Sequence, residues 1–243
     1  MRQRPARSPA SSSSDAVGDD AARRPRFRLY LITDRALCAP RELVDTCAEV
    51  LSMASREFAR GSVALQLREK DLTARDLYNL ALRLRDVCTR TGTALLVNDR
   101  IDVALAAGAD GIHLPAGSFA VADARALLGP ARLIGVSTHS VGDVAKAAAA
   151  GADFAVFGPV YDPISKSGYG APRGLEELRA VVVSVSTPMY AIGGITAART
   201  REVMSATSDR TAGVAVIGSV FGAKAPADAA REILTALAVT RSR

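Results

Sequence analysis

Five residues that close and follow a short apolar run, Gln66, Leu67, Arg68, Glu69 and Lys70, combine charge with a regular spacing. In an extended chain alternate side chains point to the same side, so Gln66, Arg68 and Lys70 share one face. Leu67 and Glu69 share the other. An arginine can bind two anion oxygens at once, and a lysine adds a compact positive charge. The spacing therefore predicts an anion clamp, and the simpler interpretation is a solvated strand end.

A second polar pair, Asn98 and Asp99, directly follows an apolar run. Magnesium prefers one or two carboxylates together with phosphate oxygens. If Asp99 lies beside the predicted anion clamp, it is a candidate ligand for Mg2+. Taken alone, Asp99 could equally cap the helix predicted over 100–107.

Two further polar residues, Ser137 and His139, precede Ser140, which has the spacing of a helix N-cap pair with Asp143. A helix N-terminus binds anions and favours a neutral imidazole. His139 is therefore a candidate functional residue, with a purely structural histidine as the alternative. His113 lies inside an apolar run, so we interpret it as a packed or hydrogen-bonded histidine.

The long stretch 158–173 separates two apolar runs and carries Ser165 and Lys166 among several Gly and Pro. Loops of this length without their own secondary structure are usually lids or binding loops. Lys166 is therefore a candidate phosphate ligand. Gly194 and Gly218 follow two later apolar runs, and glycines at such places let backbone N–H groups approach an anion closely.

Eight short apolar runs must position these residues. The runs cover residues 27–33, 63–67, 94–97, 111–114, 133–136, 154–157, 189–192 and 213–217. Amphipathic stretches that predict helices lie at 41–58, 73–90, 100–107, 119–128, 141–150, 174–184, 196–205 and 225–238. Apolar strands that alternate with helices are typical of a parallel sheet covered on both faces. We predict an α/β fold, a single (β/α)8 TIM barrel, over a doubly wound open sheet; such a barrel gathers its functional residues at the C-terminal ends of the strands.

The composition agrees with one such domain and limits the class of protein. The 243-residue chain is 49% hydrophobic but only 5% aromatic, so we expect Ala, Val, Leu and Ile to fill the interior. No apolar run reaches the roughly 20 residues that span a bilayer, which predicts a soluble, cytoplasmic protein without a membrane partner. The three cysteines lack metal-ligand spacing and predict idle thiols of a reducing compartment.

The charge is concentrated near the N-terminus, where residues 1–26 contain six Arg and three Asp and so hold +3 of the net +6. This segment lacks apolar periodicity, which predicts a disordered N-terminal tail. The barrel is expected over 27–238, followed by a C-terminal tail at 239–243. The remaining charge forms no basic stripe with interleaved aromatic residues, so no nucleic-acid partner is expected. A homo-oligomer is left open.

A series of short motifs occurs in an order that points to a family. The motifs are Leu-Tyr-Leu-Ile-Thr-Asp at 29–34, Gln-Leu-Arg-Glu-Lys at 66–70, Asn-Asp-Arg at 98–100, Gly-Ala-Asp-Gly-Ile-His-Leu at 108–114, Gly-Val-Ser-Thr-His at 135–139, Phe-Gly-Pro at 157–159 and Ala-Ile-Gly-Gly at 191–194. Over the predicted barrel, the series resembles the thiamine phosphate synthase and thiazole tautomerase family. In the synthases a hydroxymethylpyrimidine diphosphate loses its pyrophosphate, and the nitrogen of a thiazole phosphate attacks the pyrimidine carbocation.

The resemblance implies two small phosphorylated substrates, a pyrimidine diphosphate and a thiazole phosphate, and Mg2+ as the cofactor. The implied substrate-binding residues are Gln66, Leu67, Arg68, Glu69, Lys70, Asn98, Ser137, Ser165, Lys166, Gly194, Ile217 and Gly218. The last three would hold the thiazole phosphate. Asp99 would ligate Mg2+. The implied catalytic residues are Arg68, Lys70 and Lys166, which would stabilise the leaving group, together with His139.

Two positions depart from the synthase pattern. Ser118 stands where synthases usually place a second Mg2+-binding Asp, and it becomes the second candidate metal ligand. Pro163 stands where they carry a Thr that binds the thiazole phosphate, while Ser165 keeps a hydroxyl. The stretch 115–119 resembles the tautomerase branch, in which a histidine matching His139 moves a proton as the thiazole carboxylate phosphate becomes aromatic. We expect a synthase, with a tautomerase or a non-catalytic, regulatory phosphate-binding relative as alternatives.

Overall fold

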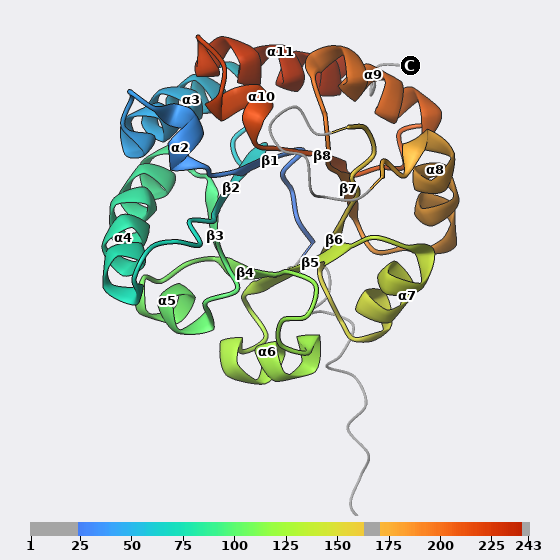
Figure 1. The fold of residues 1–243 in the computed structure, drawn as a ribbon, viewed down its shortest axis with the longest axis horizontal. Coiled ribbons are helices and arrows are strands. Elements are labelled where there is room, and N and C mark those ends of the chain that lie inside the picture. Colours follow the sequence, from blue (N-terminus) through green and yellow to red (C-terminus); the bar gives the residue numbers. More distant parts are fainter. Residues whose placement is uncertain (1–23, 163–170, 240–243) are drawn as a thin grey trace, which may run out of the picture.

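Eight parallel strands close into a barrel in the computed structural model of the protein, which describes residues 24–162 and 171–239 (Figure 1). Strands that follow one another in the chain are neighbours in the sheet, and pairing of the first strand with the last closes it. The strands are β1 (Leu29–Ile32), β2 (Val63–Leu67), β3 (Ala94–Asn98), β4 (Gly111–Leu114), β5 (Leu133–Thr138), β6 (Phe154–Phe157), β7 (Met189–Ala191) and β8 (Gly213–Val216). The predicted TIM barrel is confirmed.

A ring of helices covers the outside of the barrel. Those that match the sequence prediction are α3 (Leu43–Glu57), α4 (Ala74–Thr91), α5 (Ile101–Ala106), α6 (Val121–Leu128), α7 (Val141–Ala149), α8 (Gly174–Ser184), α9 (Ala197–Ala206) and α11 (Pro226–Val239). Their apolar faces pack on the outward side chains of the strands. Within the described ranges, none of the helices is long and apolar enough to cross a membrane.

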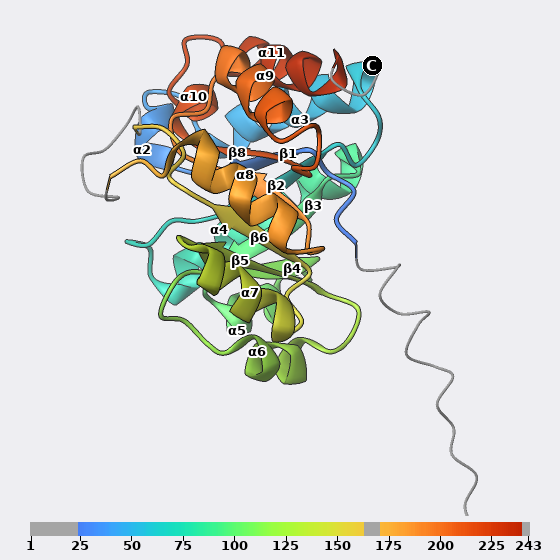
Figure 2. The same cartoon turned by 90° about the vertical axis from the view of Figure 1, so that its right-hand side faces the viewer.

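Two short helices were not predicted, α2 (Arg35–Cys38) after β1 and α10 (Gly218–Phe221) after β8. Figure 2 shows them at the same end of the barrel, where the C-terminal ends of the strands lie. Arg41 joins the two regions, because its guanidinium donates hydrogen bonds of 2.7 and 2.8 Å to the carbonyls of Ala223 and Lys224. The mouth of the barrel is therefore tied together where its first and last strands meet.

Four aromatic rings fill the barrel interior, and the expectation of a purely aliphatic interior is wrong. Phe27, Tyr30, Phe154 and Tyr190 are buried together, with ring centroids between 4.8 and 6.2 Å apart. Gly135 on β5 makes room for them, since a Cβ atom there would lie 2.2 Å from the Phe154 ring. Composition counts the aromatic residues but does not reveal that they gather in one place.

A polar layer lies above this aromatic cluster, toward the C-terminal ends of the strands. The side chains of Gln66, Asn98, His113 and Ser137 come from four consecutive strands, β2 to β5, and line a common cavity. Gln66 and His113 are almost fully buried, with 1% and 3% of their surface exposed. Strand alternation explains this layer, because successive inward positions change from apolar to polar only near the mouth.

Candidate active site

A cavity of about 320 Å³ opens at the C-terminal ends of the strands. Most of the candidate residues in the described ranges line it, namely Gln66, Arg68, Lys70, Asn98, Ser137, His139, Gly194, Ile217 and Gly218. The structure thus brings together residues that are up to about 150 positions apart in the chain. Leu67, Glu69, Asp99 and Ser118 are not among its lining residues. Ser165 and Lys166 lie outside the described residues.

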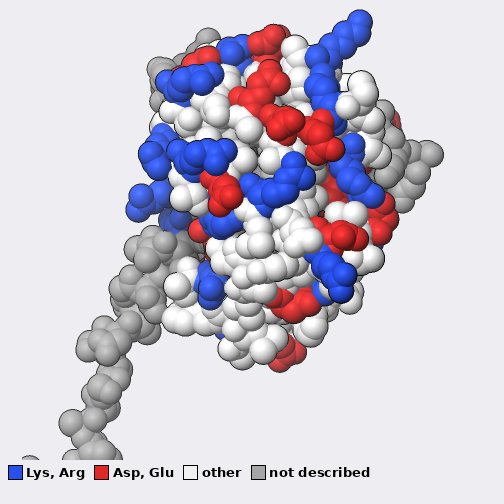
Figure 3. Space-filling model, turned by 90° about the vertical axis from the view of Figure 1, so that its left-hand side faces the viewer, with Lys and Arg blue, Asp and Glu red and all other residues white. Residues whose placement is uncertain are grey.

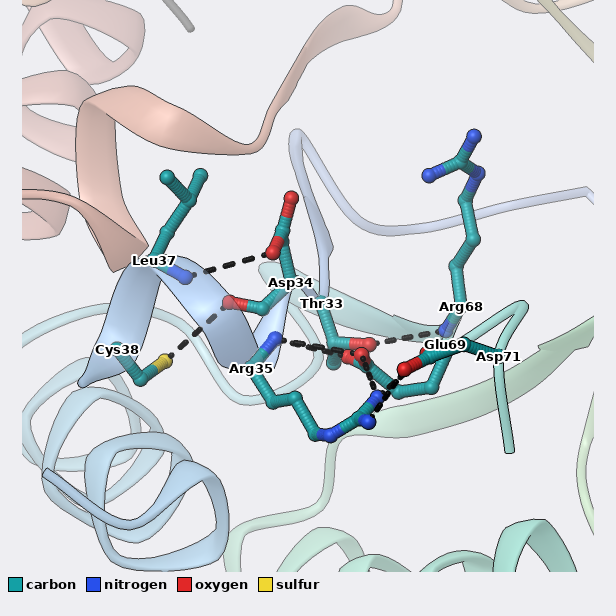
Figure 4. Close-up of polar contacts among 8 residues, drawn as sticks. All are labelled: Thr33, Asp34, Arg35, Leu37, Cys38, Arg68, Glu69 and Asp71. Carbon is teal, nitrogen blue, oxygen red and sulfur yellow. Dashed lines mark hydrogen bonds and ion pairs between the residues drawn. The ribbon is translucent and has the colours of Figure 1, made fainter. Parts of the chain in front are cut away.

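The two cations of the predicted clamp, Arg68 and Lys70, lie together at this mouth, and their role in binding an anion stays a prediction. The side chains of Arg68 and Lys70 both line the cavity, and neither makes a hydrogen bond or ion pair with another residue in the described ranges. Their charges are therefore available to a ligand. The backbone beneath them is fixed, because the Arg68 N–H donates a 2.9 Å hydrogen bond to the hydroxyl of the buried Thr33 (Figure 4).

An ion-pair network of Arg35, Glu69 and Asp71 lies on the side away from the Arg68 guanidinium (Figure 4), and none of the three is among the residues that line the cavity. The Glu69 side chain is only 5% exposed and accepts hydrogen bonds from the backbone N–H of Arg35, at 3.1 Å, and from its guanidinium, at 3.2 Å. The same guanidinium binds both oxygens of Asp71, at 2.6 and 2.5 Å, which lowers the pKa of Asp71. Glu69 and Asp71 thus alternate with Arg68 and Lys70, so one short segment carries a bracing face and a binding face.

The two predicted metal ligands lie side by side, as the Ser118 hydroxyl donates a hydrogen bond to the Asp99 carboxylate. Asp99 directly follows the lining residue Asn98 and has a φ of 64°, in the left-handed region. This conformation is uncommon for residues other than glycine, although Asp tolerates it better than most. A carboxylate and a hydroxyl are oxygen donors of the kind that Mg2+ accepts.

The floor of the cavity is held by two internal hydrogen bonds. Gln66 donates from Nε2 to the Tyr30 hydroxyl at 3.1 Å, and His113 Nε2 lies 2.9 Å from the Ser137 Oγ. Burial, with a smaller contribution from the positive charge of Arg68, lowers the pKa of His113 to about 3. Burial raises the pKa of the Tyr30 hydroxyl. All four side chains are therefore neutral near pH 7, and the interpretation of His113 as packed and hydrogen-bonded is confirmed.

The burial of neutral His113 predicts a pH-dependent stability. A histidine in an unfolded chain has a pKa near 6.5, so below that pH His113 binds a proton in the unfolded state that it does not bind in the folded state. Stability should therefore fall as the pH drops from about 6.5 toward 3, and roughly 2 kcal/mol should be lost between pH 7 and pH 5. Denaturant unfolding at both pH values should show this loss in the wild type and not in His113→Gln. Equal losses in the two proteins would contradict it.

His139 has a defined orientation at the cavity wall. Its Nδ1 lies 2.7 Å from the carbonyl oxygen of Gly158, and because a carbonyl can only accept, Nδ1 carries the proton. In the neutral ring Nε2 is then an acceptor. The His139 backbone N–H donates a 3.2 Å hydrogen bond to the Asp143 carboxylate. The Asp143 backbone N–H in turn donates to the Ser140 hydroxyl, which caps α7. Both the predicted cap and the predicted place of His139 are confirmed.

Another wall is formed by residues of the loops after β7 and β8, among them Gly193, Gly194 and Gly218. Gly193 and Gly194 have φ values of 99° and 62°, which residues with a Cβ rarely adopt. The Gly194 carbonyl accepts a 2.7 Å hydrogen bond from Arg199, whose guanidinium also lies 4.5 Å from the centre of the Tyr161 ring. The loop is therefore held in place from outside the cavity, with its glycines toward the ligand space.

Sequence reasoning missed several lining residues. Asp34, at the end of β1, lines the cavity and also caps α2 by accepting from the Leu37 N–H. Val156 and Ala215 line it as well. The motif at 29–34 contained Asp34, but only the closure of β1 onto β2 and β8 shows that this residue reaches the mouth.

On the side shown in Figure 3, where α2 to α5 lie, acidic and basic side chains are intermixed. Exposed pairs such as Arg83 with Glu42, at 3.8 Å, largely neutralise one another. This side of the barrel is therefore not a broad basic surface.

Comparisons with known proteins agree with this geometry. Residues 29–220 match the family model described as thiamine monophosphate synthase. A Geobacter sulfurreducens protein provisionally named thiamine-phosphate synthase is 46% identical over 87% of this chain and 94% of its own length. The thiamine-phosphate synthase of Methanoculleus marisnigri is 39% identical over 89% of this chain and 98% of its own.

Among solved structures, the chain is similar to thiamine phosphate pyrophosphorylase from Pyrococcus furiosus. The two superpose with a TM-score of 0.76 at 32% identity, covering 89% of this chain and 98% of that one. The residues that match the family model contain β1 to β8, and therefore the complete barrel that carries the cavity. The chain belongs to the thiamine monophosphate synthase family.

Proposed function

We propose that the protein is a thiamine phosphate synthase that joins a hydroxymethylpyrimidine diphosphate to a thiazole phosphate and releases pyrophosphate. The observation that carries the proposal is the cavity of a synthase-family barrel with two ends that differ in their lining. Arg68 and Lys70 have side chains without an ion pair among the described residues at one end, and Gly194 and Gly218 line the other, where glycine lets the backbone approach an anion closely. One end suits a diphosphate and the other a monophosphate.

The reaction needs little acid or base chemistry from the protein. The bond between the pyrimidine methylene carbon and the diphosphate oxygen breaks, and its electron pair leaves with the pyrophosphate. The thiazole nitrogen then donates its lone pair to that carbon and forms the new C–N bond. Negative charge develops on the leaving group, where preorganised cations stabilise it most. In this proposal Arg68 and Lys70 hold the leaving oxygens, and the glycine wall positions the thiazole phosphate.

A magnesium ion fits the donor set at Asp99 and Ser118. We propose that Asp99 provides the carboxylate ligand and Ser118 a neutral oxygen. Bound there, Mg2+ would neutralise part of the pyrophosphate charge. Mg2+ usually keeps several waters and takes phosphate oxygens as further ligands, so one carboxylate is compatible with binding. The left-handed backbone at Asp99 supports a functional reason for this residue.

The ion pairs that join Arg35 to Glu69 and Asp71 form a brace for the clamp. Removing this brace should weaken catalysis without removing any residue that contacts substrate. In Arg35→Ala, Asp71 loses its partner and the buried Glu69 keeps only a backbone donor. We expect kcat/KM to fall about 10-fold, because the clamp residues are no longer held in one geometry. Steady-state kinetics of thiamine phosphate formation would measure the loss.

Arg231→Ala is the matched control for the brace. Arg231 also bridges two carboxylates, those of Glu57 and Asp228, and its side chain is 38% exposed against 39% for Arg35. It joins α3 to α11 on the outer ring. The control should keep wild-type kcat/KM. If Arg35→Ala and Arg231→Ala behave alike, the brace has no role in positioning the clamp.

The proposed reaction is tested by product stoichiometry. The purified protein, given both phosphorylated substrates and Mg2+, should form thiamine phosphate and pyrophosphate in equal amounts. Omitting the thiazole phosphate should remove the thiamine phosphate. If neither product forms while the protein is folded, as judged by circular dichroism, the proposed activity is wrong.

A further inference from the structure

One ring nitrogen of His113, in the cavity floor, is buried without a hydrogen-bond partner. The atom is Nδ1, one of two buried side-chain nitrogens in the described ranges for which no hydrogen-bond partner is found. The other ring nitrogen, Nε2, lies 2.9 Å from the Ser137 hydroxyl. Both residues line the cavity, so the proton arrangement of this pair decides what the floor offers to a ligand.

Two neutral tautomers of His113 are available, and they give Ser137 opposite polarity. If Nδ1 carries the proton, Nε2 accepts the Ser137 hydroxyl proton, and the serine can only accept from a ligand. If Nε2 carries the proton, it donates to the Ser137 oxygen, and the serine O–H is free to donate into the cavity. The serine is thus an acceptor in one case and a donor in the other.

The surroundings of His113 favour the second arrangement. A proton on Nδ1 would be a fully buried donor with no acceptor, and orphaned buried N–H groups are rarer than under-used acceptors. The ring packs against Tyr30 and Phe154, with centroids 5.8 and 6.1 Å away, and Nδ1 is shielded from bulk solvent. The nearby positive charge of Arg68 opposes a doubly protonated ring. The Nε2–H form is also the intrinsically preferred neutral tautomer of histidine.

We infer that His113 is a positioning residue that holds Ser137 as a hydrogen-bond donor toward the substrate. The Nε2–H of His113 donates to Ser137 Oγ, and the serine proton points to an acceptor atom of the pyrimidine diphosphate. This role rests on the proposed synthase function for its substrate, although the tautomer itself does not. His113 neither touches the reacting atoms nor transfers a proton.

Nitrogen-15 NMR of the imidazole rings tests the tautomer directly in the wild-type protein. The chain has only two histidines, so two ring spin systems are expected, and His113→Gln identifies which belongs to His113. At pH 8 we expect the protonated nitrogen to be Nε2 in His113. His139 serves as an internal reference, since its bond to the Gly158 carbonyl places the proton on Nδ1. A proton on Nδ1 of His113 would overturn the inference.

A matched pair of variants tests the effect on catalysis. The amide nitrogen of a glutamine can reach the position of His Nε2, whereas that of an asparagine reaches the position of Nδ1. We expect His113→Gln to keep kcat/KM within about 3-fold of wild type and His113→Asn to lose about 10-fold, as for loss of one positioning hydrogen bond. A loss in His113→Gln as large as that in His113→Asn would contradict the role.

The Ser137→Ala background shows whether His113 acts through the serine. With the hydroxyl gone, His113→Asn should change kcat/KM by less than about 2-fold, since coupled residues are non-additive. An undiminished 10-fold loss in that background would mean that His113 acts elsewhere, and the inference would be wrong. Failure of the proposed function is distinguishable, because a wild type that forms no thiamine phosphate can still show the Nε2–H signal.

Discussion

Arg68→Ala should lower kcat/KM for thiamine phosphate formation by roughly 30- to 1,000-fold, which corresponds to about 2–4 kcal/mol of lost transition-state stabilisation. Arg68 lies at the cavity mouth with an unpaired guanidinium, and its backbone is fixed by Thr33. A preorganised donor of this kind acts most strongly on the charge that develops as pyrophosphate leaves. The fold should survive, because the guanidinium contacts no described residue through a hydrogen bond or ion pair.

The conservative variant separates charge from geometry at this position. Arg68→Lys keeps the positive charge but loses the fork that binds two oxygens, so its activity should lie between those of the wild type and Arg68→Ala. Thermal unfolding should give similar midpoints for all three proteins. An Arg68→Ala protein with full synthase activity would remove Arg68 from the leaving-group site.

Ser118→Asp should lower the Mg2+ concentration that gives half-maximal activity by roughly 10-fold, because the added carboxylate lies beside Asp99 and attracts the cation. Activity at saturating Mg2+ should change little, since the ion then occupies the site in both proteins. Titration of Mg2+ into the metal-stripped wild type and variant measures the difference. Ser118→Asn serves as the size-matched neutral control and should not show the gain. An unchanged Mg2+ requirement in Ser118→Asp would place the metal elsewhere.

The fold and the clamp could be predicted because their signals are local. Each apolar run is continuous and bounded by turns, and the alternation of Arg68 with Glu69 needs only the geometry of an extended chain. The cap at Ser140 is likewise a contact between residues three apart. Such patterns depend on neighbours in the sequence, and the structure has them where they were predicted.

What could not be predicted depends on contacts between distant residues. The brace joins Arg35 to Glu69, and no local pattern links a residue after one strand to a residue after the next. Helices of four residues, such as α2 and α10, are too short to show an amphipathic period. The aromatic interior requires strand closure around Phe154 and Tyr190. The orphaned nitrogen of His113 becomes visible only when every buried polar atom is placed.

The central claim is that the protein makes thiamine phosphate, and one two-product assay tests it most directly. The wild type receives the synthase substrates and, in a parallel reaction, the non-aromatic thiazole carboxylate phosphate, each with Mg2+ or with EDTA. We expect thiamine phosphate that depends on Mg2+ and disappears with EDTA, since the ion would neutralise the leaving pyrophosphate. Aromatisation of the thiazole breaks no phosphate bond and should be indifferent to EDTA. If no thiamine phosphate forms at any Mg2+ concentration while the thiazole becomes aromatic, the protein is a tautomerase and the account is contradicted.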